Sequence, residues 1–161
     1  MQMNTSPLTR THGVYTLSDD QARLDVPAMH AYLRRAYWSE QIPFDVVERA
    51  VRGSLCIGAY DANGAQVGLT RLISDYATFC YVCDVYVLEA HRGRGLSKGM
   101  MAMAVEHPRL QGLRRWSLVT ADAHGLYRQF GFVSPAKPER YMERTEPDIY
   151  IRMAEAETAI E

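Results

Sequence analysis

The fold is decided by the stretch Val85-Tyr86-Val87-Leu88-Glu89-Ala90-His91-Arg92-Gly93-Arg94-Gly95-Leu96-Ser97-Lys98. Its first residues end an apolar, β-prone run that begins at Tyr81. A polar turn with two glycines follows, and after it apolar residues recur at spacings of three and four, which predicts an amphipathic helix. The backbone N–H groups that open a helix have no partner within it. With two arginines and a lysine beside them, they predict a phosphate site at the turn and a reaction beside the preceding strand.

Three general loop types can be compared with this turn. A P-loop requires Gly-x-x-x-x-Gly-Lys-Ser/Thr, a string that the sequence does not contain. A dinucleotide-binding loop requires Gly-x-Gly-x-x-Gly within a βαβ unit, whereas this chain has Gly93-x-Gly95-x-x-x-Gly99 after a run of β-rich segments. A plain strand-to-helix turn is the third type, and three cations within seven residues argue against it.

Composition predicts one globular α/β domain. The chain has 161 residues, of which 47% are apolar and 23% charged, and its net charge of −1 gives no sign of a nucleic-acid partner. Met1–Pro7 lacks the basic and apolar regions of a signal peptide, and no run approaches the roughly 20 apolar residues that span a bilayer. We therefore expect a cytoplasmic protein with no membrane partner, one domain over residues 1–153, and a frayed tail over residues 154–161.

The three cysteines do not form a metal-binding pattern. Cys80 and Cys83 have the spacing of half a zinc motif, but positions i and i+3 of a strand point to opposite faces. No second Cys or His pair follows at ligand spacing, and Cys56 stands alone. We expect all three to be small core residues and expect no metal.

Turn and cap signals divide the first half of the chain. A first strand is expected over residues 13–17, a helix capped by Asp25, and a second helix that begins at Pro43 and ends before Gly53. Strands are expected over residues 55–60, 66–73 and 79–88, the first two joined by the hairpin signal Asn63-Gly64.

The second half is expected to return to the same sheet. Helices are predicted over residues 96–106 and 123–130, the latter capped by Asp122. The strand between them, residues 116–119, is apolar on both faces, which is typical of the centre of a covered sheet. Residues 149–153 are expected as an edge strand that could pair two subunits into a homodimer. The predicted order is β-α-α-β-β-β-α-β-α-β.

Two motifs resemble one known family. Arg92 to Ser97 is similar to the Arg/Gln-x-x-Gly-x-Gly/Ala acyl-CoA loop of the GNAT superfamily of N-acetyltransferases. Leu126 to Phe132 resembles the Leu-Tyr-x-x-x-Gly-Phe signature of the same family, about 30 residues later and with a strand between them. The sequence departs from the family at Ser97, where Gly or Ala is usual, and at Thr120, where an Asn often holds the pantetheine arm.

The resemblance implies a mixed, mostly antiparallel sheet in which two parallel strands, ending near Val87 and Val119, splay apart. Acetyl-CoA would lie in the gap, with its pantetheine arm along the first strand and its pyrophosphate on the amides of the glycine loop. The residues expected to contact it are Val85, Tyr86, Val87, Arg92, Gly93, Arg94, Gly95, Leu96, Ser97, Lys98, Thr120 and His124.

The reaction implied is the direct attack of a primary amine on the thioester. Tyr127 is the expected general acid, because a phenol stays protonated at neutral pH, and a packed core tyrosine is the alternative. Asp84 is the expected base, and an ion pair with Arg71 is its alternative. A backbone N–H near Val85 or Tyr86 could polarise the carbonyl.

The acceptor remains open at this stage. The first two predicted helices would form a flap beside the sheet. A small aromatic or hydrophobic amine would suit the aromatic residues of this flap and of the neighbouring strands, Tyr32, Trp38, Tyr76 and Tyr81. A protein N-terminus or lysine is a second possibility. Two further alternatives are a non-catalytic acyl-CoA-binding module and, less compatible with the glycine spacing, a dinucleotide-dependent oxidoreductase.

Overall fold

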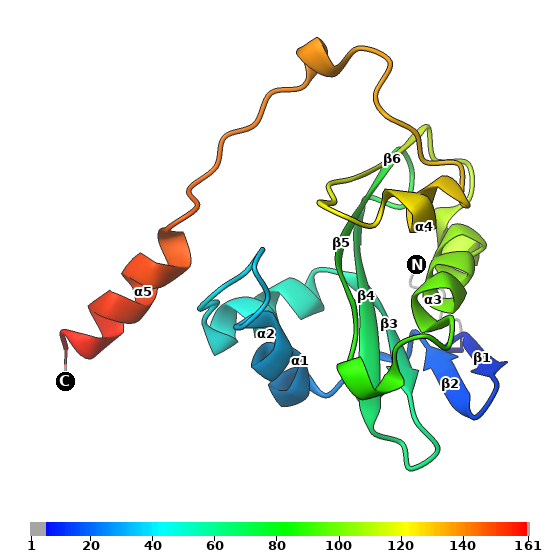
Figure 1. Cartoon of the computed structure of the whole chain (residues 1–161), viewed down its shortest axis with the longest axis horizontal. Helices are drawn as coiled ribbons and strands as arrows, with labels where there is room; N and C mark the ends of the chain where they lie inside the picture. Colours follow the sequence, from blue (N-terminus) through cyan, green and yellow to red (C-terminus); the bar gives the residue numbers. More distant parts are fainter. Residues whose placement is uncertain (1–5, 161) are drawn as a thin grey trace.

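A single six-stranded mixed sheet organises the fold in the computed structural model, which describes residues 6–160 (Figure 1). The strands lie in chain order, and every neighbouring pair is antiparallel except β5 and β6, which are parallel. The strands are β1 (Thr9–His12), β2 (Tyr15–Ser18), β3 (Leu55–Tyr60), β4 (Gln66–Ser74), β5 (Phe79–Val87) and β6 (Arg115–Leu118). The helices are α1 (Val26–Leu33), α2 (Phe44–Arg52), α3 (Leu96–Val105), α4 (His124–Arg128) and α5 (Ile149–Thr158). The expectation for residues 1–5, and that for Glu161, lies outside the described residues.

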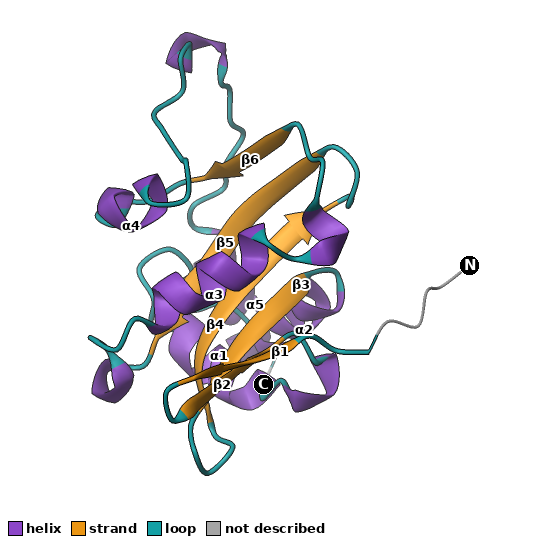
Figure 2. Cartoon of the chain, turned by 90° about the vertical axis from the view of Figure 1, so that its right-hand side faces the viewer, coloured by secondary structure: helices purple, strands orange, loops and turns teal. Residues whose placement is uncertain are grey.

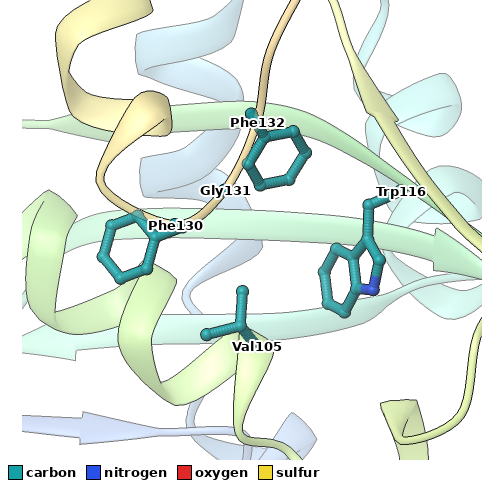
Figure 3. A pocket seen from close by; sticks show the side chains of 5 residues that line it. All are labelled: Val105, Trp116, Phe130, Gly131 and Phe132. Atoms are coloured by element: carbon teal, nitrogen blue, oxygen red, sulfur yellow. The ribbon is translucent and has the colours of Figure 1, made fainter.

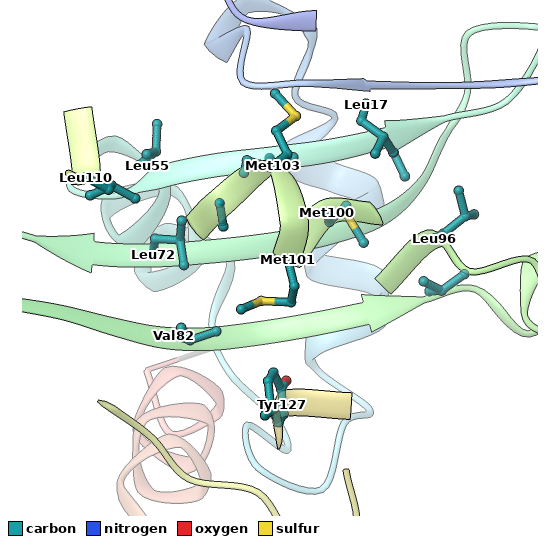
Figure 4. Packing of buried hydrophobic residues seen from close by; sticks show 14 of the residues in the cluster. Leu17, Leu55, Leu72, Val82, Leu96, Met100, Met101, Met103, Leu110 and Tyr127 are labelled. Carbon is teal, nitrogen blue, oxygen red and sulfur yellow. The ribbon is translucent and has the colours of Figure 1, made fainter. Parts of the chain in front are cut away.

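Helices cover both faces of the sheet. Helices α1 and α2 pack on one face, and α3 and α4 lie on the other (Figures 1 and 2). The α3 face forms the larger core, in which Met100, Met101 and Met103 are fully buried against β3, β4 and β5 (Figure 4). Every residue of β3 is buried, because this strand has a helical layer on each side.

The expected meander of β3, β4 and β5 is confirmed. The hairpin between β3 and β4 turns at Gly64, whose φ of 82° requires a glycine-like backbone. The carboxylate of Asp61 accepts hydrogen bonds from the backbone N–H groups of Asn63 and Ala65, at 2.9 and 3.0 Å, and so fixes this turn. Local turn chemistry therefore sets the register of the central strands.

Helices α1 and α2, which form the flap, begin where capping signals predict. The Asp25 carboxylate accepts a hydrogen bond from the N–H of Ala28 at 3.0 Å and caps α1. Helix α2 begins directly after Pro43 and ends before Gly53. Helix α1 is shorter than the apolar pattern suggests, since it ends at Leu33 and leaves Tyr37 exposed in the connecting loop.

Three expectations about the ends of the fold are wrong. In place of one strand over residues 13–17, the chain forms a hairpin of β1 and β2, because Gly13, at a φ of 60°, makes the turn between them. Strand β6 lies at the edge of the sheet and not at its centre, so its apolar residues do not reflect burial on both faces. Residues 149–153 and most of the expected tail form helix α5, because an apolar run this short fits either period.

The cap of α4 is also different from the one expected. Asp122 makes no capping hydrogen bond, and the hydroxyl of Thr120 accepts the N–H of Ala123 at 3.0 Å instead. Thr120 therefore holds the start of α4, two residues before the position that the sequence pattern suggests.

Gly58 should be intolerant of a side chain. A Cβ built there would lie 2.5 Å from the hydroxyl and 2.7 Å from Cζ of Tyr60, a residue with 1% of its surface exposed. We expect Gly58→Ala to destabilise the protein by about 1–3 kcal/mol in urea unfolding, the usual cost of overpacking a core. Gly125→Ala is the control, since a Cβ there meets no atom within 4 Å. Equal stability of both variants would contradict the packing described.

Candidate active site

Strands β5 and β6 part after four residue pairs. Their register runs from Phe79 opposite Arg115 to Val82 opposite Leu118 and stops there. Strand β5 continues to Val87, and residues 85–87 pair only with β4 on their other side. The edge of residues 85–87 that faces away from β4 is therefore open, and it can pair with an extended ligand.

A β-bulge lies at the point where this open edge begins. Thr70 is opposite Val85 and Arg71 is opposite Cys83, so that Asp84 has no partner on β4. Its φ of 20° places it outside the ordinary strand conformation. A bulge bends its strand and redirects side chains, and here it brings Asp84 beneath the helical flap.

Both oxygens of the Asp84 carboxylate accept hydrogen bonds. Arg71 donates through Nε at 2.6 Å and the indole N–H of Trp38 donates at 2.9 Å. The guanidinium of Arg71 also donates to the Ser54 hydroxyl at 3.0 Å. The ion pair with Arg71, which was the alternative to a role as base, is therefore present, and the carboxylate is only 10% exposed.

The glycine loop presents unpaired backbone donors. Gly93 and Gly95 have φ values of 76° and 73°, and Gly95 precedes α3 in the left-handed conformation. Among residues 6–160, no hydrogen bond is donated by the backbone N–H groups of residues 93–98. A Cβ at Gly93 would meet nothing within 4 Å, so that backbone conformation and not crowding calls for glycine there. These donors, at the start of a ten-residue helix, suit a phosphate.

Two of the three loop cations are held by the protein itself. Arg92 donates through Nε to the carbonyl of Val87 at 2.9 Å and also reaches the Tyr32 hydroxyl at 3.4 Å. Arg94 donates to the hydroxyl of Tyr15 at 2.7 Å. Lys98 is exposed on the first turn of α3. The two arginines therefore hold the conformation of the loop in addition to giving it positive charge.

The first β-hairpin supports the loop from below, a contact that sequence reasoning missed. His12 donates through Nε2 to the carbonyl of Arg94 at 2.8 Å, and the buried Tyr15 hydroxyl lies 2.9 Å from Nδ1 of His91. Gly99 lets α3 approach this hairpin, because a Cβ there would lie 2.9 Å from Nδ1 of His12. No local sequence signal indicates these contacts, because the residues that they join are 82 and 76 positions apart in the chain.

Tyr127 comes to the site from α4, on the opposite side of the sheet from the flap. Its side chain lies next to Val82 of β5 (Figure 4), and it is 8% exposed. Burial, with smaller contributions from nearby Tyr37 and Asp122, raises the pKa of its phenol above the ordinary value. Its hydroxyl has no hydrogen-bond partner among the described residues and is not among their fully buried oxygens, so it is free to meet a ligand.

Aromatic side chains line the flap side of the open edge. Tyr32 stacks on Tyr86 of β5 with 3.8 Å between ring centroids, and Trp38 lies edge-on to Tyr37 at 5.1 Å. Tyr37 is 70% exposed and Trp38 is 42% exposed. Tyr37 and Trp38 form an exposed aromatic patch beside Asp84, whereas Tyr76 contacts Arg109 elsewhere.

Two hollows lie on the β6 side. The larger is a groove of about 490 Å³ between β6, α4 and residues 131–136, and its lining includes Thr120, His124 and Tyr127. The smaller, of about 290 Å³, is lined by apolar side chains and Gly131 alone: Val105, Trp116, Phe130, Gly131 and Phe132 (Figure 3). Without an ionisable group, the smaller hollow offers nothing for acid–base chemistry.

The cysteines lie in the protein as expected for core residues. Cys56 and Cys80 are buried, Cys83 is half-buried, and burial raises the pKa of each thiol to about 12. They are thus poor nucleophiles at neutral pH. No group of three or more potential metal ligands occurs within residues 6–160, and none of the helices there is both long and apolar enough to cross a membrane.

Known proteins resemble this chain in sequence and in fold. A sequence profile of the acetyltransferase (GNAT) family matches residues 14–132. A predicted acetyltransferase of Gibberella zeae is 37% identical in an alignment of 145 positions, and the match covers 76% of this chain and 81% of that protein. A crystal structure of a predicted GNAT-family acetyltransferase from Xanthomonas campestris pv. campestris superposes with a TM-score of 0.82 at 48% identity, covering 84% of this chain and 96% of that one.

A more distant structure shares the fold. It is that of a predicted acetyltransferase from Clostridium acetobutylicum, solved with acetyl-CoA, with a TM-score of 0.58 at 16% identity over 86% of this chain and 96% of that one.

Proposed function

Since this chain belongs to the acetyltransferase (GNAT) family, we propose that it transfers an acetyl group from acetyl-CoA to the primary amine of a small aromatic or hydrophobic molecule. The observation that carries the choice of acceptor is the aromatic patch of Tyr37 and Trp38 beside the Asp84 carboxylate. Exposed aromatic rings bind apolar groups and attract cations, and a carboxylate attracts an ammonium group. An amine with an apolar body satisfies both.

The open edge and the glycine loop fit acetyl-CoA. Unpaired backbone N–H groups from Gly93 to Lys98 would hold its pyrophosphate, and residues 85–87 would pair with its pantetheine arm. The carbonyl of Val87 already accepts a hydrogen bond from Arg92, so the pairing with the pantetheine arm would rest mainly on Val85 and Tyr86. Thr120 and His124 would contribute from the α4 side of the gap. Acetyl-CoA supplies the activated acyl thioester.

We assign proton donation to Tyr127. Burial raises the pKa of its phenol, so the hydroxyl keeps its proton at neutral pH and can deliver it to a thiolate leaving group. The bulge at Asp84 leaves backbone N–H groups of the following residues on the open edge, where one of them would stabilise negative charge on the carbonyl oxygen.

We assign proton acceptance to Asp84. Trp38 and Arg71 fix the direction of its carboxylate, and each oxygen keeps a lone pair for the acceptor amine or for one water. Held in this way, the carboxylate would both orient the ammonium group and remove its proton before attack.

Gly95→Glu should abolish cofactor binding. A negative side chain at the loop would oppose the pyrophosphate, and we expect the Kd for acetyl-CoA and for CoA to rise by about 100-fold or more, which is ~3 kcal/mol. Isothermal titration calorimetry measures this change. Gly112→Glu is the control, because Gly112 also has a positive φ, 75°, and open space around it, but lies beyond the far end of α3. Unchanged affinity of the Gly95 variant would remove the loop from the site.

Tyr127→Phe should lower turnover and leave cofactor affinity within about twofold. Loss of a general acid typically costs a factor of about 10²–10⁴ in kcat. Thiol release with a panel of arylalkyl amines measures the rate, and Tyr76→Phe controls for the loss of a remote hydroxyl. Because the pKa of Tyr127 is raised, the wild-type rate should not fall through its deprotonation below about pH 10. Full activity of Tyr127→Phe would disprove the assignment.

Asp84→Asn should lower turnover most strongly at the lowest pH. At high pH the acceptor amine is already neutral and needs no base, so the defect, about 10²–10⁴ at neutral pH, should shrink as the pH approaches the pKa of the amine. A pH–rate profile measures this, and Glu89→Gln, which alters an exposed carboxylate on the loop, should match wild type. A defect of equal size at every pH would leave Asp84 a positioning role only.

A further inference from the structure

Strand β1 lies outside the part of the chain that the family profile matches. The profile begins at residue 14, whereas β1 ends at His12. Strand β1 is the first in the sheet order and pairs with β2 alone. The hairpin of these two strands lies beside the start of α3, where it meets the glycine loop (Figure 1). The contacts between β1 and the loop are therefore features of this chain that the profile does not describe.

The hairpin holds both the backbone and the side chain of Arg94. His12 donates through Nε2 to the Arg94 carbonyl at 2.8 Å, and the Arg94 guanidinium donates to the Tyr15 hydroxyl at 2.7 Å. Residues 93–95 are all exposed, and among residues 6–160 their one other hydrogen bond is the helical one that Gly95 accepts from the N–H of Gly99. The left-handed turn that precedes α3 is therefore fixed mainly by the hairpin.

One arrangement of protons satisfies this network. A guanidinium can only donate, so the Tyr15 oxygen accepts from Arg94 and the Tyr15 hydroxyl proton needs another acceptor. Nδ1 of His91, 2.9 Å away, is that acceptor and therefore carries no proton. Because Tyr15 is only 4% exposed, loss of this acceptor would leave a buried donor unpaired, which is costly. The hydrogen bonds thus lead from Arg94 through Tyr15 back to a residue three positions before Arg94.

Gly99 shows how closely α3 fits against His12. It lies inside α3, where glycine is a poor helix former and alanine the best. A Cβ at this position would lie 2.9 Å from Nδ1 and 3.2 Å from Cε1 of His12, and 3.1 Å from Cδ1 of Leu17. The space that the glycine leaves is therefore occupied by the imidazole that holds the loop. The hairpin contact accounts for the third glycine of the run Gly93-x-Gly95-x-x-x-Gly99.

We propose that His12 is a positioning residue for acetyl-CoA, which fixes the glycine loop so that its unpaired N–H groups are oriented for the pyrophosphate before the cofactor binds. This rests on the proposed function, because it requires the loop to bind a pyrophosphate. A loop that is fixed in advance loses less conformational entropy on binding. His12 contacts the loop and not the open edge of β5, so it acts on the affinity for a donor that contains pyrophosphate and not on acetyl transfer itself.

Two acetyl donors test the proposal. S-acetylpantetheine has the thioester and the pantetheine arm of acetyl-CoA but no pyrophosphate. For His12→Ala we expect KM for acetyl-CoA to rise about 10-fold, the usual effect of losing one hydrogen bond, with kcat within about twofold of wild type. The value of kcat/KM for S-acetylpantetheine should stay within about twofold of wild type. A variant impaired only in folding would lose activity with both donors alike.

His12→Gln is the conservative variant, and Thr11→Ala is the matched control. The Nε2 amide of glutamine can donate to the Arg94 carbonyl in place of the imidazole, so His12→Gln should recover most of the affinity for acetyl-CoA. Thr11 is an exposed neighbour on β1 whose side chain makes no hydrogen bond within the described chain. Its truncation should leave the kinetics with both donors at wild-type values.

Gly99→Ala gives a second, independent readout. Its Cβ should displace the His12 imidazole, so we expect KM for acetyl-CoA to rise about 10-fold although alanine favours the helix. In a His12→Ala background this clash is gone, and Gly99→Ala should then raise KM by less than about twofold further. Such non-additivity indicates that the two residues act through one contact.

Equal losses with both donors, or additive effects of the two substitutions, would overturn the role of His12. Failure of the proposed function would look different, because wild type would then transfer no acetyl group from either donor. Calorimetry with CoA separates the two cases, since it measures the Kd of wild type and His12→Ala without turnover. An unchanged Kd in His12→Ala would remove the positioning role, and a Kd raised about 10-fold would support it even in a protein without turnover.

Discussion

Strands β5 and β6 share four residue pairs, and the features of the site follow from the point where this pairing stops. Parallel neighbours that stay paired would leave no free backbone groups between them. Here the bulge at Asp84 bends β5 just after the last pair, so residues 85–87 keep one open edge inside the fold. An open edge in a protected position can bind a ligand without exposing the sheet to aggregation.

The glycine loop depends on contacts that lie outside it. Gly93 and Gly95 allow the backbone to turn at positive φ, but the lack of a Cβ at both positions also gives the loop more conformational freedom. That freedom is restricted by Arg94 on Tyr15, by His12 on the carbonyl of Arg94 and by Arg92 on the carbonyl of Val87. A loop whose donors are already oriented loses less entropy when it binds an anion. The first hairpin thus supports the candidate site through its contacts with the loop.

The parts of the fold that the sequence predicts are those set by local chemistry. Strand β3 has the expected bounds, α1 has the expected cap, and α2 begins after Pro43 and ends before Gly53. Features that depend on which segments become neighbours escape prediction. The edge position of β6 does not alter its own pattern of residues, and the Asp84 bulge is a matter of register with β4. Trp38 and Asp84 meet across 46 positions, so no spacing rule could join them.

The two open edges of the sheet present different physical problems. The edge of β5 is enclosed between the flap and α4, and its polar groups are matched by the amides of an extended ligand. The edge of β6 borders a groove that is lined by Arg115, Arg128 and apolar side chains. An unpaired strand of this kind is usually shortened, charged or covered. Here β6 is only four residues long and begins at Arg115, yet the groove beside it continues to Tyr127. A segment that paired with β6 would therefore also limit the space beside Tyr127, the proposed proton donor.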